Sequence, residues 1–279
     1  MSAPIHVALP TALPAAVALP VPPRGVPDWL RRAGIALRSF SIFLLAWWLL
    51  ALWNNNPIQL PDPLRVAKAM LELAADGELL EHASVSTGRL LLSLLTATLI
   101  AVPLGFCMGL SRRVEAYLDP LVELLRPISG IAWIPLALFI FGVGNTLPVF
   151  IMVYVAIFPL LLNTVAGVRG VDAKLLAAAR TMGISRRATL RHVVVPAALP
   201  TVMVGLRLAF AGAWAAVVAA ELIGAPSGLG FAIEWYRQLL MSPKVFGFIA
   251  VIGLIGFVSD TLLRALQRKL TPWTEGTGL

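Results

Sequence analysis

The sequence predicts an all-α integral membrane protein with about six transmembrane helices. Of its 279 residues, 59% are hydrophobic and 13% are charged, whereas a soluble domain has about 45–50% apolar and about 25% charged residues. Six stretches are apolar enough to cross a bilayer, and one basic, glycine-broken segment separates the fourth from the fifth. These runs are too long and too uniformly apolar for the alternating strands of a membrane β-barrel.

The first 34 residues are predicted to form a disordered cytoplasmic tail rich in proline and alanine. Seven prolines within the first 27 residues break any helix there. The tail lacks the basic start and continuous apolar core of a secretory signal peptide. Residues 35–270 are predicted to form one transmembrane domain, and residues 271–279 a short C-terminal tail.

The predicted spans follow from the need for about 20 mostly apolar residues per helical crossing. They lie at about residues 35–53, 89–110, 124–142, 146–168, 199–223 and 245–266. Gly105 and Gly109 in the second span permit close helix approach, within one subunit or across a dimer. Glu123 and Arg126 lie three residues apart, and we expect them to form a structural ion pair.

The distribution of Lys and Arg predicts the orientation. With the N-terminus inside, fifteen of these residues lie in inside segments and five in outside segments. Basic residues favour the cytoplasmic side, so both termini and the basic middle loop are predicted to be cytoplasmic. The net charge of +8 therefore does not indicate nucleic-acid binding, because the charges lie between apolar spans.

Two outside segments are predicted to contain short helices. Asp62 precedes Pro63, a residue pair typical of a helix start, and an amphipathic pattern follows it. In residues 224–244, Gly and Pro residues indicate turns around a short helix.

The basic segment, about residues 171–196, is predicted to fold as helix, glycine turn, helix. Asp172 is a good N-cap, and Leu175, Ala179 and Met182 share one helical face. Gly183 stands where a helix C-terminus favours a left-handed residue.

The second helix of this segment is predicted to begin at Ser185 and to be limited by Pro196. Two interpretations follow from the residues alone. The segment is either an interfacial helix held on anionic lipid by its arginines, or a plug that fits a groove on a cytoplasmic partner.

This segment resembles the signature of permeases of binding-protein-dependent ABC importers, in which Glu-Ala-Ala is followed by three residues, Gly, nine residues and Ile-x-Leu-Pro. Ala177 stands in place of the Glu. The matching or neighbouring residues that the resemblance assigns to ATPase coupling are Ala177, Ala178, Ala179, Gly183, Arg186, Arg187, Val193, Val195 and Pro196. Stretches such as "WIPLALFIFGVG" and "AAELIGAPSGLGF" are similar to the nitrate, sulfonate and taurine branch of these permeases.

The resemblance implies a multi-pass protein of the bacterial inner membrane that carries small organic or oxo-anions, sulfonates such as taurine first. It implies a homodimer in the lipid bilayer, two cytoplasmic ATPase subunits and an external substrate-binding protein. The chain has no G-x-x-x-x-G-K-[ST] phosphate loop. ATP and magnesium are therefore expected on the partner ATPase, with no cofactor and no catalysis in this chain.

Four residues within the spans are candidates for the translocation pathway. Arg207, Trp214 and Glu221 are spaced by seven residues and share one helical stripe. A charge in a span indicates function by default, although interface positions or packing would also explain these residues. Trp133, followed by Pro135, could shape the pathway or pack in the core.

Two other classes of protein fit the sequence less well. A secondary transporter working without ATP often has inverted repeats and broken midplane helices, and the sequence shows no convincing repeat. An intramembrane enzyme needs a convergent acid–base or metal site. Cys107 is the single cysteine, and the three histidines lie in different segments, so neither a disulfide nor a metal site is expected.

Overall fold

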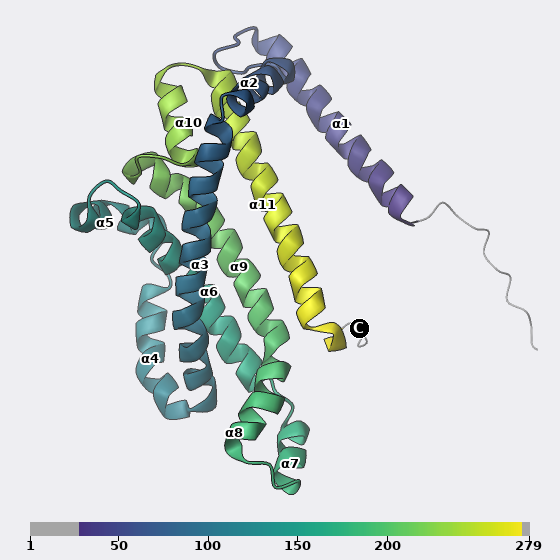
Figure 1. Cartoon of the computed structure of the whole chain (residues 1–279), viewed down its shortest axis with the longest axis vertical. Helices are drawn as coiled ribbons and strands as arrows, with labels where there is room; N and C mark the ends of the chain where they lie inside the picture. Colours follow the sequence, from purple (N-terminus) through teal and green to yellow (C-terminus); the bar gives the residue numbers. More distant parts are fainter. Residues whose placement is uncertain (1–27, 275–279) are drawn as a thin grey trace, which may run out of the picture. The chain divides into compact units, whose positions relative to one another are not determined.

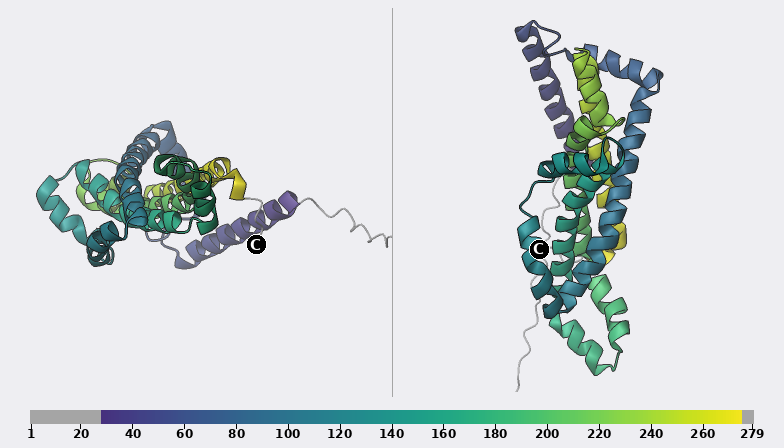
Figure 2. Two further views of the ribbon diagram at one scale, coloured as in Figure 1. Left: turned by 90° about the horizontal axis from the view of Figure 1, so that it is seen from below. Right: turned by 90° about the vertical axis from the view of Figure 1, so that its left-hand side faces the viewer.

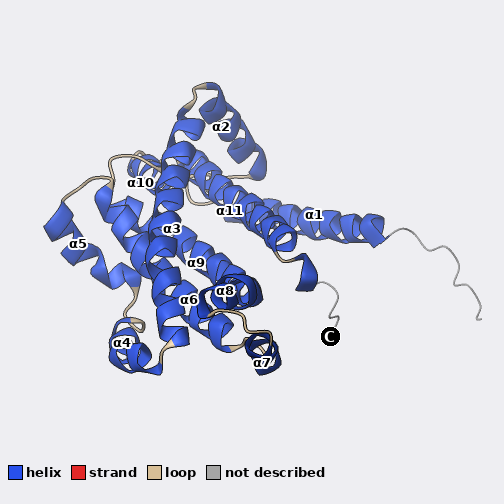
Figure 3. Cartoon of the chain, turned by 60° about the horizontal axis from the view of Figure 1, so that its bottom comes forward, coloured by secondary structure: helices blue, strands red, loops and turns tan. Residues whose placement is uncertain are grey.

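The computed structural model describes residues 28–274, and within this range the regular elements are all helices, with no strand (Figure 3). The predicted tail residues 1–27 and 275–279 lie outside the described residues. The chain divides into two compact units, Met1–Leu49 and Leu50–Leu279, which are described separately.

In the first unit the described residues belong to helix α1, Asp28–Asn54. Its segment Gly34–Asn54 is long and apolar enough to cross a membrane. The helix begins seven residues earlier than predicted, so residues 28–34 of the predicted tail are helical. Phe43 and Trp47 lie one turn apart, with ring centroids 6.3 Å from each other.

The second unit is organised around three long helices, α3 (Glu78–Leu110), α6 (Thr146–Arg169) and α9 (Val195–Gly224), as Figure 1 shows. Their facing sides carry buried Ala and Gly residues, which let the helix backbones approach closely, and buried Leu and Met side chains, which fill the space between the helices. A fourth long helix, α11 (Ser242–Leu270), packs against α9 and against α2 (Pro63–Ala75).

Gly105 and Gly109 make the contact between α3 and α6 within one subunit. A Cβ atom on Gly105 would lie 2.7 Å from Cβ of Thr164, and one on Gly109 would lie 2.7 Å from Cβ of Val168. The structure therefore settles the alternative that the sequence left open: these glycines serve packing inside the subunit.

The third predicted span, about residues 124–142, is wrong as a single helix. Helix α4 (Arg112–Leu125) ends there, and a 3-10 turn, η1 (Gly130–Trp133), leads into α5 (Ile134–Phe141) at an angle of 83° to α4. Pro127 lies at the break, and it has no N–H to continue the hydrogen bonding of α4. The described residues thus contain five helices able to cross a membrane, or up to six crossings if the bent pair counts as one.

The short helices of the second unit lie at opposite ends of the bundle. Helices α2 and α10 (Leu229–Gln238) lie at one end, and α7 (Ala173–Thr181) and α8 (Arg186–Thr189) at the other (Figures 1 and 2). The predicted start of α2 is confirmed, since the Asp62 carboxylate accepts a hydrogen bond from the Arg65 backbone N–H at 2.9 Å. After a turn at Gly77, α3 begins at Glu78, eleven residues before the predicted second span.

Candidate functional site

The basic segment folds as two short helices around Gly183. The Asp172 carboxylate caps α7 by accepting from the Lys174 N–H at 2.8 Å. At the other end, the Gly183 N–H donates to the Arg180 carbonyl at 3.0 Å and the Ile184 N–H to the Ala179 carbonyl at 3.1 Å. This bond pair is a Schellman motif, and the φ of +70° at Gly183 is the left-handed geometry that it requires. The predicted turn at Gly183 is confirmed.

We call the two helices α7 and α8, with the turn at Gly183, the hairpin. Its surface is both apolar and basic. On the predicted apolar face, Leu175 is 50% and Met182 76% exposed, whereas the smaller Ala179 is 3% exposed. Ala177 and Ala178 are also exposed. The hairpin arginines are exposed and form no ion pair with any described residue: Arg180, Arg186, Arg187 and Arg191.

The second helix of the hairpin does not stop at Pro196, which corrects the prediction. Ser185 caps α8, and the chain continues through a π-helical turn, η2 (Leu190–Val194), directly into α9. The wider turn accommodates a proline that has no N–H for the usual i−4 bond. Residues Arg186–Gly224 therefore form one continuous helical segment.

The three motif residues nearest this junction differ in exposure. Val193 and Pro196 are half-buried, and Val195 is 39% exposed. Val194 between them is 5% exposed and packs with Ala198 and Val168. The junction is thus anchored on the end of α6.

Two of the predicted pathway residues on α9 contact α11. The Arg207 guanidinium forms an ion pair with Asp260 at 3.2 Å, and both side chains are about one-third exposed. Trp214 is 8% exposed and donates its indole N–H to the Ile252 carbonyl at 3.1 Å. Gly256 allows this approach, since a Cβ there would lie 2.8 Å from the indole nitrogen. Their contribution to a pathway stays a prediction.

Glu221, the third of these residues, is 1% exposed and forms an ion pair with Arg89 of α3 at 2.6 Å. Both Glu221 oxygens also accept from the Ser86 hydroxyl, and one accepts from the Gly230 N–H at 3.0 Å. Arg89 in turn donates to Asn145 and to the carbonyl and hydroxyl oxygens of Ser227. We call these side chains the Arg89–Glu221 cluster.

Sequence reasoning missed Arg89, which the predicted span boundary placed at a loop edge. The sequence does contain a signal for this residue, namely polar residues at helical spacing in an otherwise apolar stretch. They are Ser86, Arg89 and Ser93, spaced by three and four residues. All three are buried on one side of α3. The cluster ties α3, α9, the start of α6 and the start of α10 together at one end of the bundle.

Helix α10 carries titratable groups outside the predicted spans. The Tyr236 hydroxyl donates to Glu78, and burial, reinforced by Glu78, raises the pKa of Tyr236 to about 12. Hydrogen bonds from Arg237 and Gln238 lower the pKa of half-buried Glu234 to about 2. Both groups therefore keep one charge state at physiological pH.

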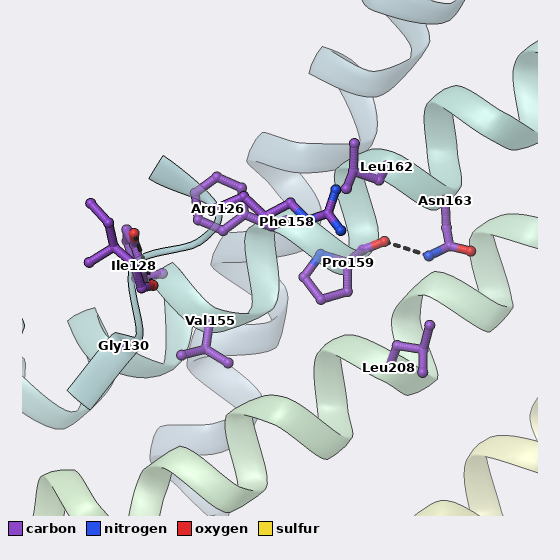
Figure 4. A pocket seen from close by; sticks show the side chains of 10 residues that line it. Arg126, Ile128, Gly130, Val155, Phe158, Pro159, Leu162, Asn163 and Leu208 are labelled. Atoms are coloured by element: carbon purple, nitrogen blue, oxygen red, sulfur yellow. Dashed lines mark hydrogen bonds between the residues drawn. The ribbon is translucent and has the colours of Figure 1, made fainter. Parts of the chain in front are cut away.

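A cavity of about 360 Å³ lies where the third predicted span breaks (Figure 4). We call it the central cavity. Its walls come from the break, from α6 and from α9: Arg126, Ile128, Gly130, Tyr154, Val155, Phe158, Pro159, Leu162, Asn163 and Leu208. Gly130 brings the broken segment against α6, because a Cβ there would lie 2.4 Å from Val155 Cγ2.

Polar groups of the central cavity come from three residues. The Arg126 side chain extends along α6 toward Leu162 (Figure 4). The Asn163 amide nitrogen donates to the Pro159 carbonyl at 2.8 Å, and the Tyr154 hydroxyl donates to the Leu125 carbonyl at 2.6 Å. The expected pair of Glu123 and Arg126 is wrong, because no ion pair joins them among the described residues.

Trp133, the fourth predicted pathway residue, lies beside this cavity rather than in its wall. Its ring is half-buried and lies 5.4 Å from that of Tyr154, centroid to centroid. Its buried indole N–H has no hydrogen-bond partner among the described residues. Residues 28–274 also hold no group of three His, Cys, Asp or Glu side chains that could bind a metal ion.

Comparison with known proteins agrees with this arrangement. Residues 97–272 match the family described as "Binding-protein-dependent transport system inner membrane component". The chain is 38% identical to the "Taurine transport system permease protein TauC" of Escherichia coli over 250 residues, covering 87% of this chain and 90% of that protein. It is 36% identical to the "Putative aliphatic sulfonates transport permease protein SsuC" of Bacillus subtilis, covering 77% and 78%.

Among solved structures, a chain of "an amino acid ABC transporter with histidines" superposes with a TM-score of 0.57. The match covers 72% of this chain and 96% of that one at 16% sequence identity. It shows a shared fold.

Proposed function

Because the chain belongs to the family of binding-protein-dependent transport system inner membrane components, we propose that it forms the translocation pathway of an ATP-driven importer for sulfonates of the taurine type. The observation that carries the substrate class is the 38% identity to a taurine permease over 87% of the chain. The 36% identity to a permease named for aliphatic sulfonates supports the same class.

The hairpin of α7 and α8 is the proposed contact with the partner ATPase. Its exposed Leu175 and Met182 offer an apolar face, and the unpaired hairpin arginines surround it. A compact helical hairpin with an apolar face suits a groove on a protein partner better than a flat lipid surface. Because α8 continues into α9, displacement of the hairpin would reach the middle of the bundle without a flexible joint.

The proposed mechanism is alternating access. ATP closes the ATPase dimer and moves the hairpin, and the spans open toward a loaded binding protein outside. Hydrolysis returns the subunit to the inward-facing state. The chain supplies the pathway and the hairpin that transmits the movement of the ATPase. ATP and magnesium bind to the partner, so the chain requires no cofactor of its own.

The proposed orientation places the hairpin and both chain termini in the cytoplasm of a bacterium, with the chain in its inner membrane. The excess of fifteen over five basic residues supports it. The positions of α7 and α8 at one end of the bundle and of α2 and α10 at the other are consistent with it. A second copy of this chain would complete the pathway as a homodimer.

Affinity purification of the tagged chain in mild detergent tests this proposal. We expect a stoichiometric ATPase subunit to co-purify, and the associated binding protein to bind taurine or another sulfonate. A chain that purifies alone and moves solute in vesicles without ATP would instead be a secondary transporter.

A further inference from the structure

Among the arginines that the second unit carries within its predicted spans, Arg126 is the one without a carboxylate partner among the described residues. The other arginines that the second unit carries within its predicted spans pair with carboxylates. Arg89 lies 2.6 Å from Glu221, and Arg207 and Arg264 both pair with Asp260. Arg126 has no ion pair or hydrogen-bonded side chain among the described residues, and it is exposed on the subunit. Its guanidinium therefore keeps all five donors available.

The depth of Arg126 makes this position unusual. It contacts a cavity whose α6 wall runs from Tyr154 to Asn163, in the middle of a helix that spans Thr146–Arg169. Leu208, on the α9 wall, lies near the middle of Val195–Gly224. An arginine facing lipid at this depth is strongly unfavourable. We therefore expect the surface around Arg126 to face water, an anion or the second subunit of the proposed homodimer, rather than lipid.

The chemistry of the central cavity fits an organic sulfonate. The Arg126 guanidinium can donate two parallel hydrogen bonds to an oxyanion. The Asn163 amide uses one hydrogen on the Pro159 carbonyl and retains a second. Val155, Phe158 and Leu162 supply an apolar wall for a short alkyl chain.

Residues that line the cavity fix the backbone on both sides of Arg126. The Tyr154 hydroxyl donates to the carbonyl of Leu125, the residue before Arg126. The close approach of Gly130 to Val155 holds the other side of the break. The broken third span thus presents Arg126 from a defined backbone position, as discontinuous helices do at other membrane binding sites.

We propose that the central cavity is a sulfonate-binding subsite within the membrane, with Arg126 as the anion-binding residue. This inference rests on the proposed function and deepens it. The subsite holds the anion after release from the binding protein and before exit to the cytoplasm. The volume of about 360 Å³ accommodates a two-carbon sulfonate together with water.

Taurine uptake by proteoliposomes containing the complete transporter tests the subsite. We expect Arg126→Gln to lower uptake per ATP hydrolysed about tenfold or more, and Arg126→Lys to retain part of it. Arg113→Gln, which removes an exposed arginine from α4, the helix that Arg126 caps at its C-terminus, serves as the matched control and should keep wild-type uptake. Wild-type uptake by Arg126→Gln would overturn the inference.

A thiol-labelling experiment decides the point even if that variant folds poorly. In a Cys107→Ala background, Asn163→Cys places a thiol in the cavity wall while Arg126 stays intact. When each rate is divided by that reagent's rate with a small free thiol, we expect a methanethiosulfonate bearing a sulfonate to react at least about threefold faster than one bearing trimethylammonium. Adding Arg126→Gln should abolish this preference. No labelling, or equal rates with Arg126 present, would refute the subsite.

The two experiments separate the subsite from the transport function. A wild-type transporter that takes up no sulfonate would refute the proposed function. The thiol preference does not depend on transport, so it would still establish or exclude an anion site at Arg126.

Discussion

Arg89 and Glu221 show how single residues connect distant parts of this chain. They are 132 positions apart in sequence, yet they form a fully buried ion pair that also satisfies Ser86, Ser227 and the Gly230 N–H. Sequence periodicity identified Glu221 as unusual, because a carboxylate in an apolar helix stands out. The periodicity could not identify Arg89 as the partner of Glu221, because that pairing depends on how α3 packs against α9.

Removing one member of this pair should destabilise the subunit strongly. Arg89→Met leaves Glu221 as a buried charge without a counter-ion, a change that costs about 3–5 kcal/mol in comparable buried pairs. We expect a clear drop in the melting temperature of the purified protein in detergent. Arg237→Met, which breaks the pair of exposed Arg237 with half-buried Glu234, is the control and should leave the melting temperature unchanged. Equal effects of the two variants would contradict the role assigned to the cluster.

Gly105 gives a second prediction at the residue scale. Gly105→Ala forces α3 away from Thr164, since the added Cβ would lie 2.7 Å from the Thr164 Cβ. Overpacking of this kind costs about 1–3 kcal/mol.

Gly88→Ala on the same helix is the comparison, because open space surrounds that position. Thermal unfolding should show a loss for the first variant and no loss for the second. A stable Gly105→Ala protein would mean that the α3–α6 contact is looser than described.

At the scale of elements, the caps and turns were predictable and the continuity of the helices was not. Asp62 and Asp172 cap helices through hydrogen bonds to residues two or three positions away, and Gly183 ends a helix through its own backbone conformation. Their residue types were therefore sufficient to predict these helix ends. Pro196 and Pro127 were harder to interpret. Pro196 lies within a continuous helical segment because a π-helical turn absorbs it, whereas Pro127 lies where a span breaks. Packing of the surrounding helices decides between these outcomes.

The glycine turn of the hairpin is a testable element. Gly183→Val strains a residue held at a φ of +70°, where a β-branched side chain is unfavourable. We expect the variant to insert into the membrane normally and to lose most ATP-driven uptake while its partner still hydrolyses ATP.

Gly183→Asn is the matched variant, because asparagine tolerates the left-handed region. It should retain more uptake than the valine variant. Normal ATP-driven uptake by Gly183→Val would refute the role of this turn in coupling.

At the scale of the whole molecule, composition and apolar runs were enough to predict a helical membrane protein, because each crossing must satisfy its own backbone hydrogen bonds. The central cavity could not be predicted in this way. It exists because the break at Pro127 places Arg126 against the middle of α6, and that contact depends on the tertiary fold. The sequence-based pathway residues Arg207, Trp214 and Glu221 instead pair with neighbouring helices.

The most direct test of the central claim is taurine uptake by proteoliposomes that contain this chain, its co-purifying ATPase and the binding protein. The account predicts accumulation that requires enclosed ATP, the loaded binding protein and the ATPase, and that stops when any one is omitted. Uptake by this chain alone, without ATP, would contradict the account and identify the protein as a secondary transporter.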